Sequence, residues 1–182
     1  MRLPLIFGLL FLTTVVGCAT TGGGTRTTAD GWTVRQVNKG KSSKEIAWRA
    51  GSPGSSWARD SARTADFAWV HTKRPATIYG DSTCGKKFDD VPLTVLVNHL
   101  TFGFEEVATQ SQESMQLSGR AGLRRVLTAS LDGRPIKLAS TVVKKGPCIF
   151  DLVYVTADVA AFDSALPDYQ AVVDGLSIRE GR

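Results

Sequence analysis

Three consecutive strand-like runs place the strongest constraint on how this chain folds. Residues 123–131 and 136–143 are rich in apolar and β-branched residues, and they flank Asp132-Gly133, a pair that favours a tight hairpin turn. Arg134-Pro135 follows directly, so we expect a hairpin one or two residues wider than the minimum. A third run at residues 148–156 comes after a short connection. The three runs therefore predict an antiparallel meander.

Shorter runs of alternating apolar and polar residues predict the other strands. They lie at residues 32–37, 46–49, 65–72 and 76–79, and the glycine- and serine-rich segment 51–56 predicts a loop. A helix is predicted after Pro92, which is well tolerated in a first helical turn, and Gly103 marks its end. Its apolar face consists of Leu93, Leu96, Val97, Leu100 and Phe104, and a last helix is predicted at residues 164–175.

The length of 182 residues suits one folded domain, and 42% of the residues are hydrophobic. Strands interspersed with two helical segments predict an α+β domain at residues 31–180, in which helices pack on a mainly antiparallel β-sheet. The element order and the pattern Phe162…Leu166-Pro167-Asp168-Tyr169…Val173 resemble the PsbP-like, or Mog1p-like, α/β/α sandwich family. The resemblance covers residues 31–178 and implies a binding or assembly accessory of the kind that is often secreted or lipid-anchored.

The N-terminus has the pattern of a secretory signal peptide. Residues 1–17 carry Arg2 followed by an apolar run that is short for the roughly 20 residues a membrane-spanning helix needs. The run ends in Val15-Val16-Gly17-Cys18, which resembles the lipobox of bacterial lipoproteins. The resemblance implies cleavage before Cys18 and acylation of its thiol, whereas an ordinary signal peptide is the alternative. Two or three acyl chains would anchor the protein to a membrane without spanning it.

Residues 18–30 are predicted to be the lipidated cysteine and a flexible tether. The segment after Cys18 has no large apolar residue, and its run Gly22-Gly23-Gly24 maximises backbone freedom. Ala19 stands where an aspartate tends to keep enterobacterial lipoproteins on the inner membrane, so the resemblance favours the outer membrane. We therefore expect a protein held by its lipid on the periplasmic side of a bacterial cell envelope.

Cys84 and Cys148 remain once Cys18 is assigned to lipid. An even pair of cysteines in an exported chain is typical of a disulfide, and both residues lie near the ends of predicted elements. Two separate buried thiols are the alternative. The pair lacks the Cys-x-x-Cys spacing of redox-active sites.

Basic residues occur in pairs at predicted loops and strand ends, in a chain of formal net charge +5. Lys86, Lys87, Lys144 and Lys145 are candidate contacts with anionic headgroups or an acidic partner. Solvated positive surface is the alternative. An exported protein does not meet nucleic acid, so we expect none as a partner.

Trp57 follows the loop at residues 51–56, and its side chain has two possible placements. Its ring could be exposed and anchor a partner, or it could fold back as a lid over the core. Trp32, Trp48 and Trp69 occupy inward positions of predicted strands and are expected in the core.

No recognised catalytic or metal-binding motif occurs in the sequence. His71 and His99 are the only histidines and lack further ligands at zinc-binding spacing, and no G-x-S-x-G motif supports a serine hydrolase. We expect no cofactor and no metal. The leading hypothesis is a non-catalytic envelope accessory that binds a partner protein or an amphiphilic ligand. A purely structural lipoprotein and an unrecognised hydrolase are the alternatives.

Overall fold

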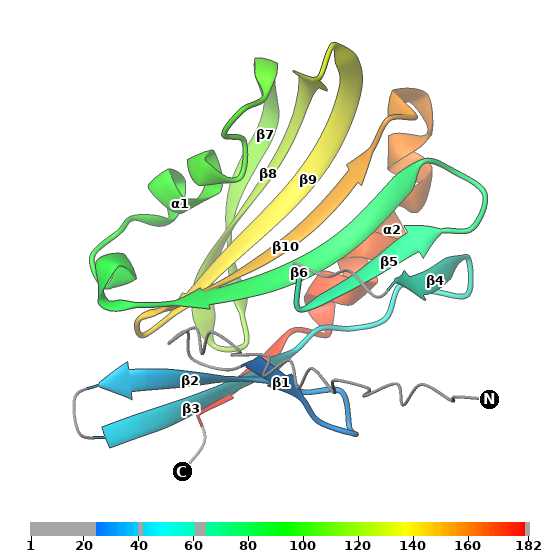
Figure 1. The fold of residues 1–182 in the computed structure, drawn as a ribbon. Coiled ribbons are helices and arrows are strands. Elements are labelled where there is room, and N and C mark those ends of the chain that lie inside the picture. The colour runs from blue at the N-terminus through cyan, green and yellow to red at the C-terminus, as the bar shows by residue number, and fades with distance from the viewer. Residues whose placement is uncertain (1–24, 40–41, 61–64, 181–182) are drawn as a thin grey trace, which may run out of the picture.

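The computed structural model describes residues 25–39, 42–60 and 65–180, whose strands form two antiparallel sheets (Figure 1). The small sheet has the order β1-β2-β3-β11 and the large sheet the order β4-β5-β6-β10-β9-β8-β7. The small sheet consists of β1 (Thr25–Thr27), β2 (Thr33–Lys39), β3 (Ser42–Arg49) and β11 (Ser177–Glu180). The large sheet consists of β4 (Trp57–Asp60), β5 (Phe67–His71), β6 (Ala76–Cys84), β7 (Glu105–Leu117), β8 (Arg120–Leu131), β9 (Arg134–Lys145) and β10 (Cys148–Thr156).

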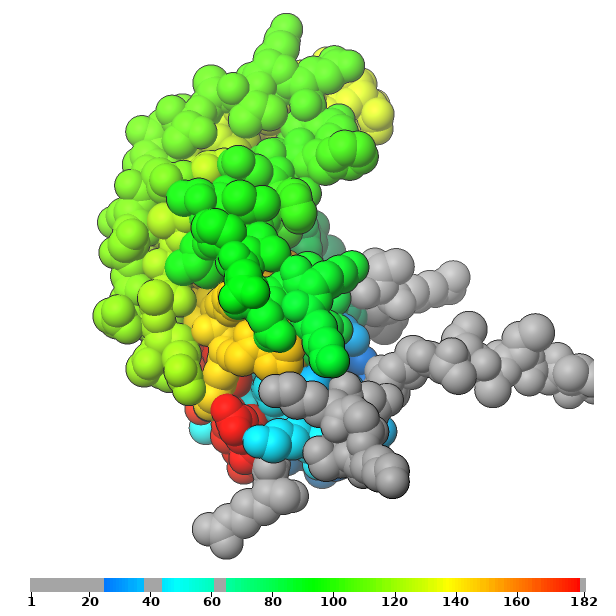
Figure 2. Space-filling view, turned by 90° about the vertical axis from the view of Figure 1, so that its left-hand side faces the viewer, coloured from blue at the N-terminus to red at the C-terminus, as the bar shows by residue number. Residues whose placement is uncertain are grey.

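Helices cover both faces of the large sheet. They are η1 (Lys86–Phe88), α1 (Leu93–His99), η2 (Val159–Ala161) and α2 (Phe162–Asp174). Leu96 and Val97 of α1 pack against Ile149 of β10, whereas Tyr169 of α2 packs with Phe150 of the same strand. Successive side chains of a strand point to opposite faces, so the two helices lie on opposite sides. In Figure 2 the green residues of η1 and α1 lie over the nearer face of that sheet. This arrangement confirms the predicted single α+β domain.

The predicted meander is present as β8, β9 and β10, each paired with the next along nearly its whole length. Asp132 and Gly133 have φ values of 51° and 73°, and Leu131 pairs directly with Arg134. Two positive φ values are what a two-residue type I′ turn requires. The expectation of a wider hairpin was therefore wrong, because Arg134-Pro135 lies inside the strand and not in the turn.

The core is aromatic on the side of α2. Trp48, Tyr154, Tyr169, Phe150 and Phe162 are almost completely buried there. Trp32 and Trp69 are also buried, so the three tryptophans expected in the core are confirmed. A Cβ atom at Gly80 would lie 2.2 Å from the ring of Phe67 and 2.9 Å from Trp48. Only glycine at this point of β6 leaves room for both rings.

A buried ion pair connects the small sheet to the edge of the large one. Arg35 of β2 lies 3.0 Å from Asp66 and 3.1 Å from Asp81 of β6. Trp48 of β3 donates its indole N–H to the other oxygen of Asp66 at 3.0 Å. The carboxylate of Asp66, which is 3% exposed, is therefore satisfied on both oxygens and fixes the seam between the sheets.

Two segments differ from the sequence-based expectations. Residues 105–117 carry a mostly polar sequence that predicted no strand, but they form the long edge strand β7. Thr25–Thr27 lie in the segment predicted as a tether, yet they form β1 and pair with Thr33–Arg35 of β2. The domain as described therefore starts at least six residues before the predicted boundary at residue 31. Residues 1–24, with the predicted signal peptide and Cys18, lie outside the described residues.

No helix in the described part of the chain combines the length and apolar character needed to cross a bilayer.

Candidate functional site

A disulfide joins Cys84 and Cys148 at one end of the large sheet, which confirms the predicted bridge. The two residues lie directly opposite one another on β6 and β10, with their Cα atoms 4.0 Å apart. Gly85 donates its backbone N–H to the carbonyl of Pro147 at 2.8 Å beside the bridge. The β9–β10 turn and the start of η1 are thus held together by a covalent bond and a hydrogen bond.

The four candidate contact lysines gather at this same end of the molecule. Lys86 and Lys87 belong to η1, which begins two residues after Cys84. Lys144 and Lys145 end β9, where Lys145 lies opposite Cys148. The structure gives the two pairs different environments. Lys86 and Lys87 are exposed, and the ammonium of Lys87 lies 4.9 Å from the ring of Phe88.

Lys144 and Lys145 donate to backbone carbonyl groups. The Lys144 ammonium binds the carbonyl oxygens of Asp89 and Val91 in the connection to α1. The Lys145 ammonium donates to the carbonyl of Ile178 in β11 at 3.1 Å. Both side chains are half-buried and tie neighbouring segments together. Lys144 and Lys145 therefore have a structural role that the sequence did not reveal. Contact of these two lysines with a partner stays a prediction.

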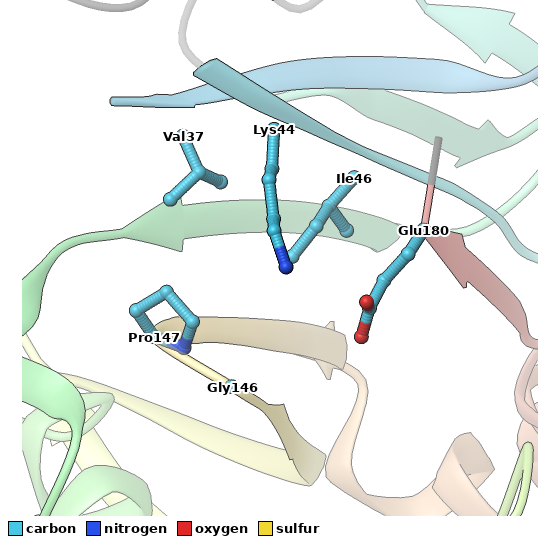
Figure 3. A pocket seen from close by; sticks show the side chains of 6 residues that line it. All are labelled: Val37, Lys44, Ile46, Gly146, Pro147 and Glu180. Carbon is cyan, nitrogen blue, oxygen red and sulfur yellow. The ribbon is translucent and has the colours of Figure 1, made fainter. Parts of the chain in front are cut away.

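A pocket opens between the small sheet and the β9–β10 turn (Figure 3). Its volume is about 180 Å³. Val37, Ile46 and Pro147 supply apolar walls, and the side chains of Lys44 and Glu180 point into it from β3 and β11. A space of this size is smaller than the roughly 300 Å³ typical of small-molecule sites, and it matches one side chain better than a whole ligand. We call it the inter-sheet pocket.

Trp57 is buried, and of its two predicted positions the structure shows the one that folds back over the core. The exposed position, as a partner contact, was wrong. The side chain is 7% exposed, and its indole N–H donates to Asp168 of α2 at 2.9 Å. Its ring meets those of His71 and Tyr154 edge-on, at centroid distances of 5.0 and 6.1 Å. Asp168 precedes the buried Tyr169 on α2, so the acceptor for the indole N–H lies on the inner side of the ring.

A polar cluster that sequence reasoning missed lies on the face of the large sheet that carries α1. Asp151 of β10 lies opposite Asp81 of β6, and Tyr79 and Ser140 belong to the same face. Asp151 Oδ1 and Ser140 Oγ are buried, and no described residue offers either atom a hydrogen bond. The signal in the sequence was an aspartate in the middle of the otherwise apolar central strand CIFDLVYVT.

Burial dominates the electrostatics of that cluster. Burial first, and then the charge of Asp81, raise the pKa of Asp151 to about 7. Burial and the two aspartates also raise the pKa of Tyr79. A carboxyl group in this state binds a proton near neutral pH because the ionised form lacks solvation and meets a like charge.

The histidines do not form a catalytic or metal-binding constellation within the described residues. His71 Nδ1 accepts the backbone N–H of Lys73 at 3.1 Å, and His99 is exposed at the end of α1. Among residues 25–39, 42–60 and 65–180, no group of three or more acidic, histidine or cysteine side chains is placed to hold a metal ion.

Comparison with known proteins identifies the fold. No protein-family model and no curated protein matches the chain. Among solved structures, LpqN of Mycobacterium tuberculosis, described as involved in cell envelope biogenesis, aligns with a TM-score of 0.57 at 13% identity, covering 80% of this chain and 90% of LpqN. Cyanobacterial PsbP (CyanoP) from Synechocystis aligns with a TM-score of 0.52 at 10% identity, covering 92% and 99%. The chain therefore has the PsbP-like fold that the sequence pattern predicted.

Proposed function

We propose that this protein is a bacterial envelope lipoprotein, anchored through Cys18, whose domain binds a partner protein without catalysing a reaction. The observation that carries the proposal is the Cys84–Cys148 disulfide. Disulfides persist in exported proteins and are rare in reducing cytosol. An oxidised bridge therefore supports export, and the lipobox-like Val15-Val16-Gly17-Cys18 supplies the anchor.

The distance between the anchor and the domain fits this arrangement. Cys18 lies seven residues before Thr25, the first residue of β1. Seven residues reach at most about 24 Å when fully extended. The lipid would keep the domain close to the membrane surface, and Ala19 favours the outer membrane as its location.

The inter-sheet pocket supports a protein partner over an amphiphilic ligand. Large aromatic side chains, among them Trp48, Tyr154 and Tyr169, fill the described space between α2 and the sheet. The inter-sheet pocket instead has room for one apolar side chain, with Lys44 and Glu180 at its mouth. Burial of one well-packed side chain in such a pocket is how many protein interfaces gain most of their affinity.

The surrounding charge indicates an acidic partner surface. Lys86 and Lys87 are exposed beyond the disulfide, and the turn at Pro147 that lines the pocket is bonded to Gly85 directly before them. Positive charge around an apolar seat raises the association rate with an acidic partner and discriminates against basic ones. The alignment with LpqN, a protein described as involved in cell envelope biogenesis, supports an envelope role.

Site-specific photocrosslinking in intact cells tests the proposal. A photoreactive residue at Lys44 is expected to give one predominant crosslinked protein, and the same residue at the exposed Lys73 in the β5–β6 turn is the matched control. Adding Lys86→Glu and Lys87→Glu should reduce the Lys44 crosslink at least about threefold, because charge reversal weakens electrostatic steering. Equal crosslinking from both positions, or none from Lys44, would contradict a partner at the inter-sheet pocket and favour a purely structural lipoprotein.

A further inference from the structure

A second hollow lies at the seam between the small sheet and the β4–β5 edge of the large sheet. Its volume is about 470 Å³, and it opens broadly to solvent. Arg49 enters it from the end of β3, Arg59 from β4 and Trp69 from β5. Asp30, Ala50, Ser52 and three glycines, which are Gly31, Gly51 and Gly175, complete the lining. We call it the arginine hollow.

Aromatic rings hold the guanidinium groups of the arginine hollow in place. The guanidinium carbon of Arg59 lies 4.8 Å from the centre of Trp69 and 5.6 Å from that of Phe67. The guanidinium of Arg49 lies 4.7 Å over Trp32, whose ring is also contacted by Arg179 at 3.9 Å. Stacking uses the flat face of a guanidinium and leaves its in-plane N–H donors available.

No protein acceptor occupies those donors in the described part of the chain. Arg26, Arg35, Arg74, Arg124 and Arg125 each donate a side-chain hydrogen bond. Arg49 and Arg59 make neither a hydrogen bond nor an ion pair with any described residue. Both side chains are exposed to solvent, and partial burial lowers the pKa of Arg59.

Asp30 is the acidic residue of the lining, and its carboxylate is hydrogen-bonded to a neighbouring residue. Its carboxylate accepts the hydroxyl of Thr28 at 2.5 Å. That hydrogen bond lowers the pKa of Asp30 most, followed by a backbone hydrogen bond and then the charges of Arg179 and Arg49, so the group stays ionised at neutral pH. The lining therefore carries two positive charges and one negative charge.

We propose that the arginine hollow binds a phosphate group, with Arg49 and Arg59 as its ligands. Oxygen atoms of phosphate match the planar fork of a guanidinium and accept two parallel hydrogen bonds from it. Two pre-oriented forks converge on the hollow from different sheets, so little side-chain entropy is lost on binding. The site is separate from the inter-sheet pocket, and it does not depend on the proposed function.

The position of the hollow makes a lipid headgroup one source of the phosphate. Asp30 and Gly31, which line it, follow β1, and β1 begins seven residues after Cys18. A lipid-anchored domain would hold this region near the headgroup layer. A free phosphorylated metabolite is the other source, and both present the same oxygen atoms to the arginines.

Calorimetric titration of the chain from residue 19 onward tests the proposal, because that chain keeps every described residue and needs no lipid. The probes are inorganic phosphate and glycerol phosphate at constant ionic strength. We expect saturable binding that Arg49→Gln combined with Arg59→Gln weakens at least tenfold. Arg120→Gln combined with Arg134→Gln removes the same charge from exposed arginines elsewhere and is expected to leave the affinity unchanged.

Two further variants separate recognition from folding and from net charge. Arg59→Lys keeps the charge but loses the fork, and it should weaken binding at least threefold. Asp30→Asn removes from the lining a negative charge that repels phosphate, and it should strengthen phosphate binding two- to fivefold at low salt. A variant that merely unfolded the domain could not bind more tightly than the parent chain.

Vesicle sedimentation distinguishes the two sources. Phosphatidylcholine vesicles with and without phosphatidylglycerol are compared for the parent chain and for the Arg49→Gln, Arg59→Gln chain. Retention that requires both phosphatidylglycerol and the two arginines assigns the site to headgroups. Binding of soluble phosphate without such retention assigns it to a free phosphate compound. The proposal is overturned if neither probe binds, or if the control pair loses as much affinity as the hollow pair.

Discussion

At the scale of single residues, the environment decides what each side chain does. Asp151 and Asp66 both have buried carboxylate oxygens, yet Asp66 is satisfied by Arg35 and Trp48. One oxygen of Asp151 has no partner among the described residues, and this aspartate faces Asp81. An ionised aspartate therefore stabilises the fold at position 66 and destabilises it at position 151. The sequence contains both aspartates, but it does not say which of them meets an arginine.

Asp151 predicts a pH dependence of stability. Its pKa in the folded protein, about 7, exceeds its ordinary value of 3.8, so the folded state binds the proton more tightly than the unfolded state. The stabilisation is complete below pH 4 and is lost as the pH rises through about 7. The difference corresponds to a few kcal/mol, by about 1.4 kcal/mol for each unit of pKa.

Urea unfolding at several pH values between 4 and 8 measures this effect. Asp151→Asn should flatten the pH dependence and should be more stable than the parent chain at pH 8. Asp90→Asn, at an exposed position before α1, is the matched control. Parallel pH profiles for the parent and Asp151→Asn chains would show that the carboxyl group titrates normally.

The hydrogen bond between Trp57 and Asp168 is expected to contribute to the stability of the domain. Trp57→Phe keeps a six-membered aromatic ring but removes the pyrrole ring with its N–H donor to Asp168 and leaves that acceptor unsatisfied. We expect a loss of about 1–3 kcal/mol in the free energy of unfolding. Asp168→Asn keeps an oxygen acceptor and should cost less. Equal stability of the Trp57→Phe and parent chains would contradict an inward-facing, bonded indole.

At the scale of elements, pairing with neighbours overrides local preference. Residues 105–117 have a mostly polar sequence, but they form the longest strand because β8 offers a complete unpaired edge. Conversely, the apolar runs of β8 and β9 and the Asp132-Gly133 pair between them were sufficient to predict their pairing, since a tight turn brings the two strands side by side. Local patterns thus predict adjacent partners well and distant or polar ones poorly.

The disulfide between β6 and β10 predicts a large loss of stability on reduction. It closes a separation of 64 residues, and the chain-entropy relation gives roughly 4 kcal/mol for such a loop. Cys84→Ala combined with Cys148→Ala should lower the free energy of unfolding by about 2–4 kcal/mol. The parent chain with a reductant should lose a similar amount. A reductant that further destabilises the double variant would point to an effect unrelated to this bridge.

At the scale of the whole molecule, two separate concave surfaces lie around the small sheet. The inter-sheet pocket lies beside the disulfide, and the arginine hollow lies at the β4–β5 seam. The ion pair of Arg35 with Asp66 fixes the two sheets relative to one another, so both surfaces keep their shape. Neither surface belongs to one element alone.

The proposed lipid anchor predicts the outcome of changing Cys18. Cys18→Ser removes the thiol that the lipobox resemblance assigns to acylation, and the chain should lose its membrane attachment or remain uncleaved. Fractionation and intact mass of protein from its native host measure this. Cys84→Ala combined with Cys148→Ala is the control and should stay attached. Unchanged retention after cleavage of Cys18→Ser would refute the lipid anchor.

The sequence by itself determined the hairpin at Asp132-Gly133, most strands, both principal helices and the cysteine pair, because these depend on neighbours close in the chain or on residue type. It also carries the N-terminal pattern from which the anchor is proposed. Only the tertiary structure decided that Trp57 turns inward, that Lys144 and Lys145 bind carbonyl groups, and that Arg49 and Arg59 meet in one hollow. Those outcomes depend on groups far apart in the sequence, and the burial and charge that each group meets exist only after the two sheets have packed together.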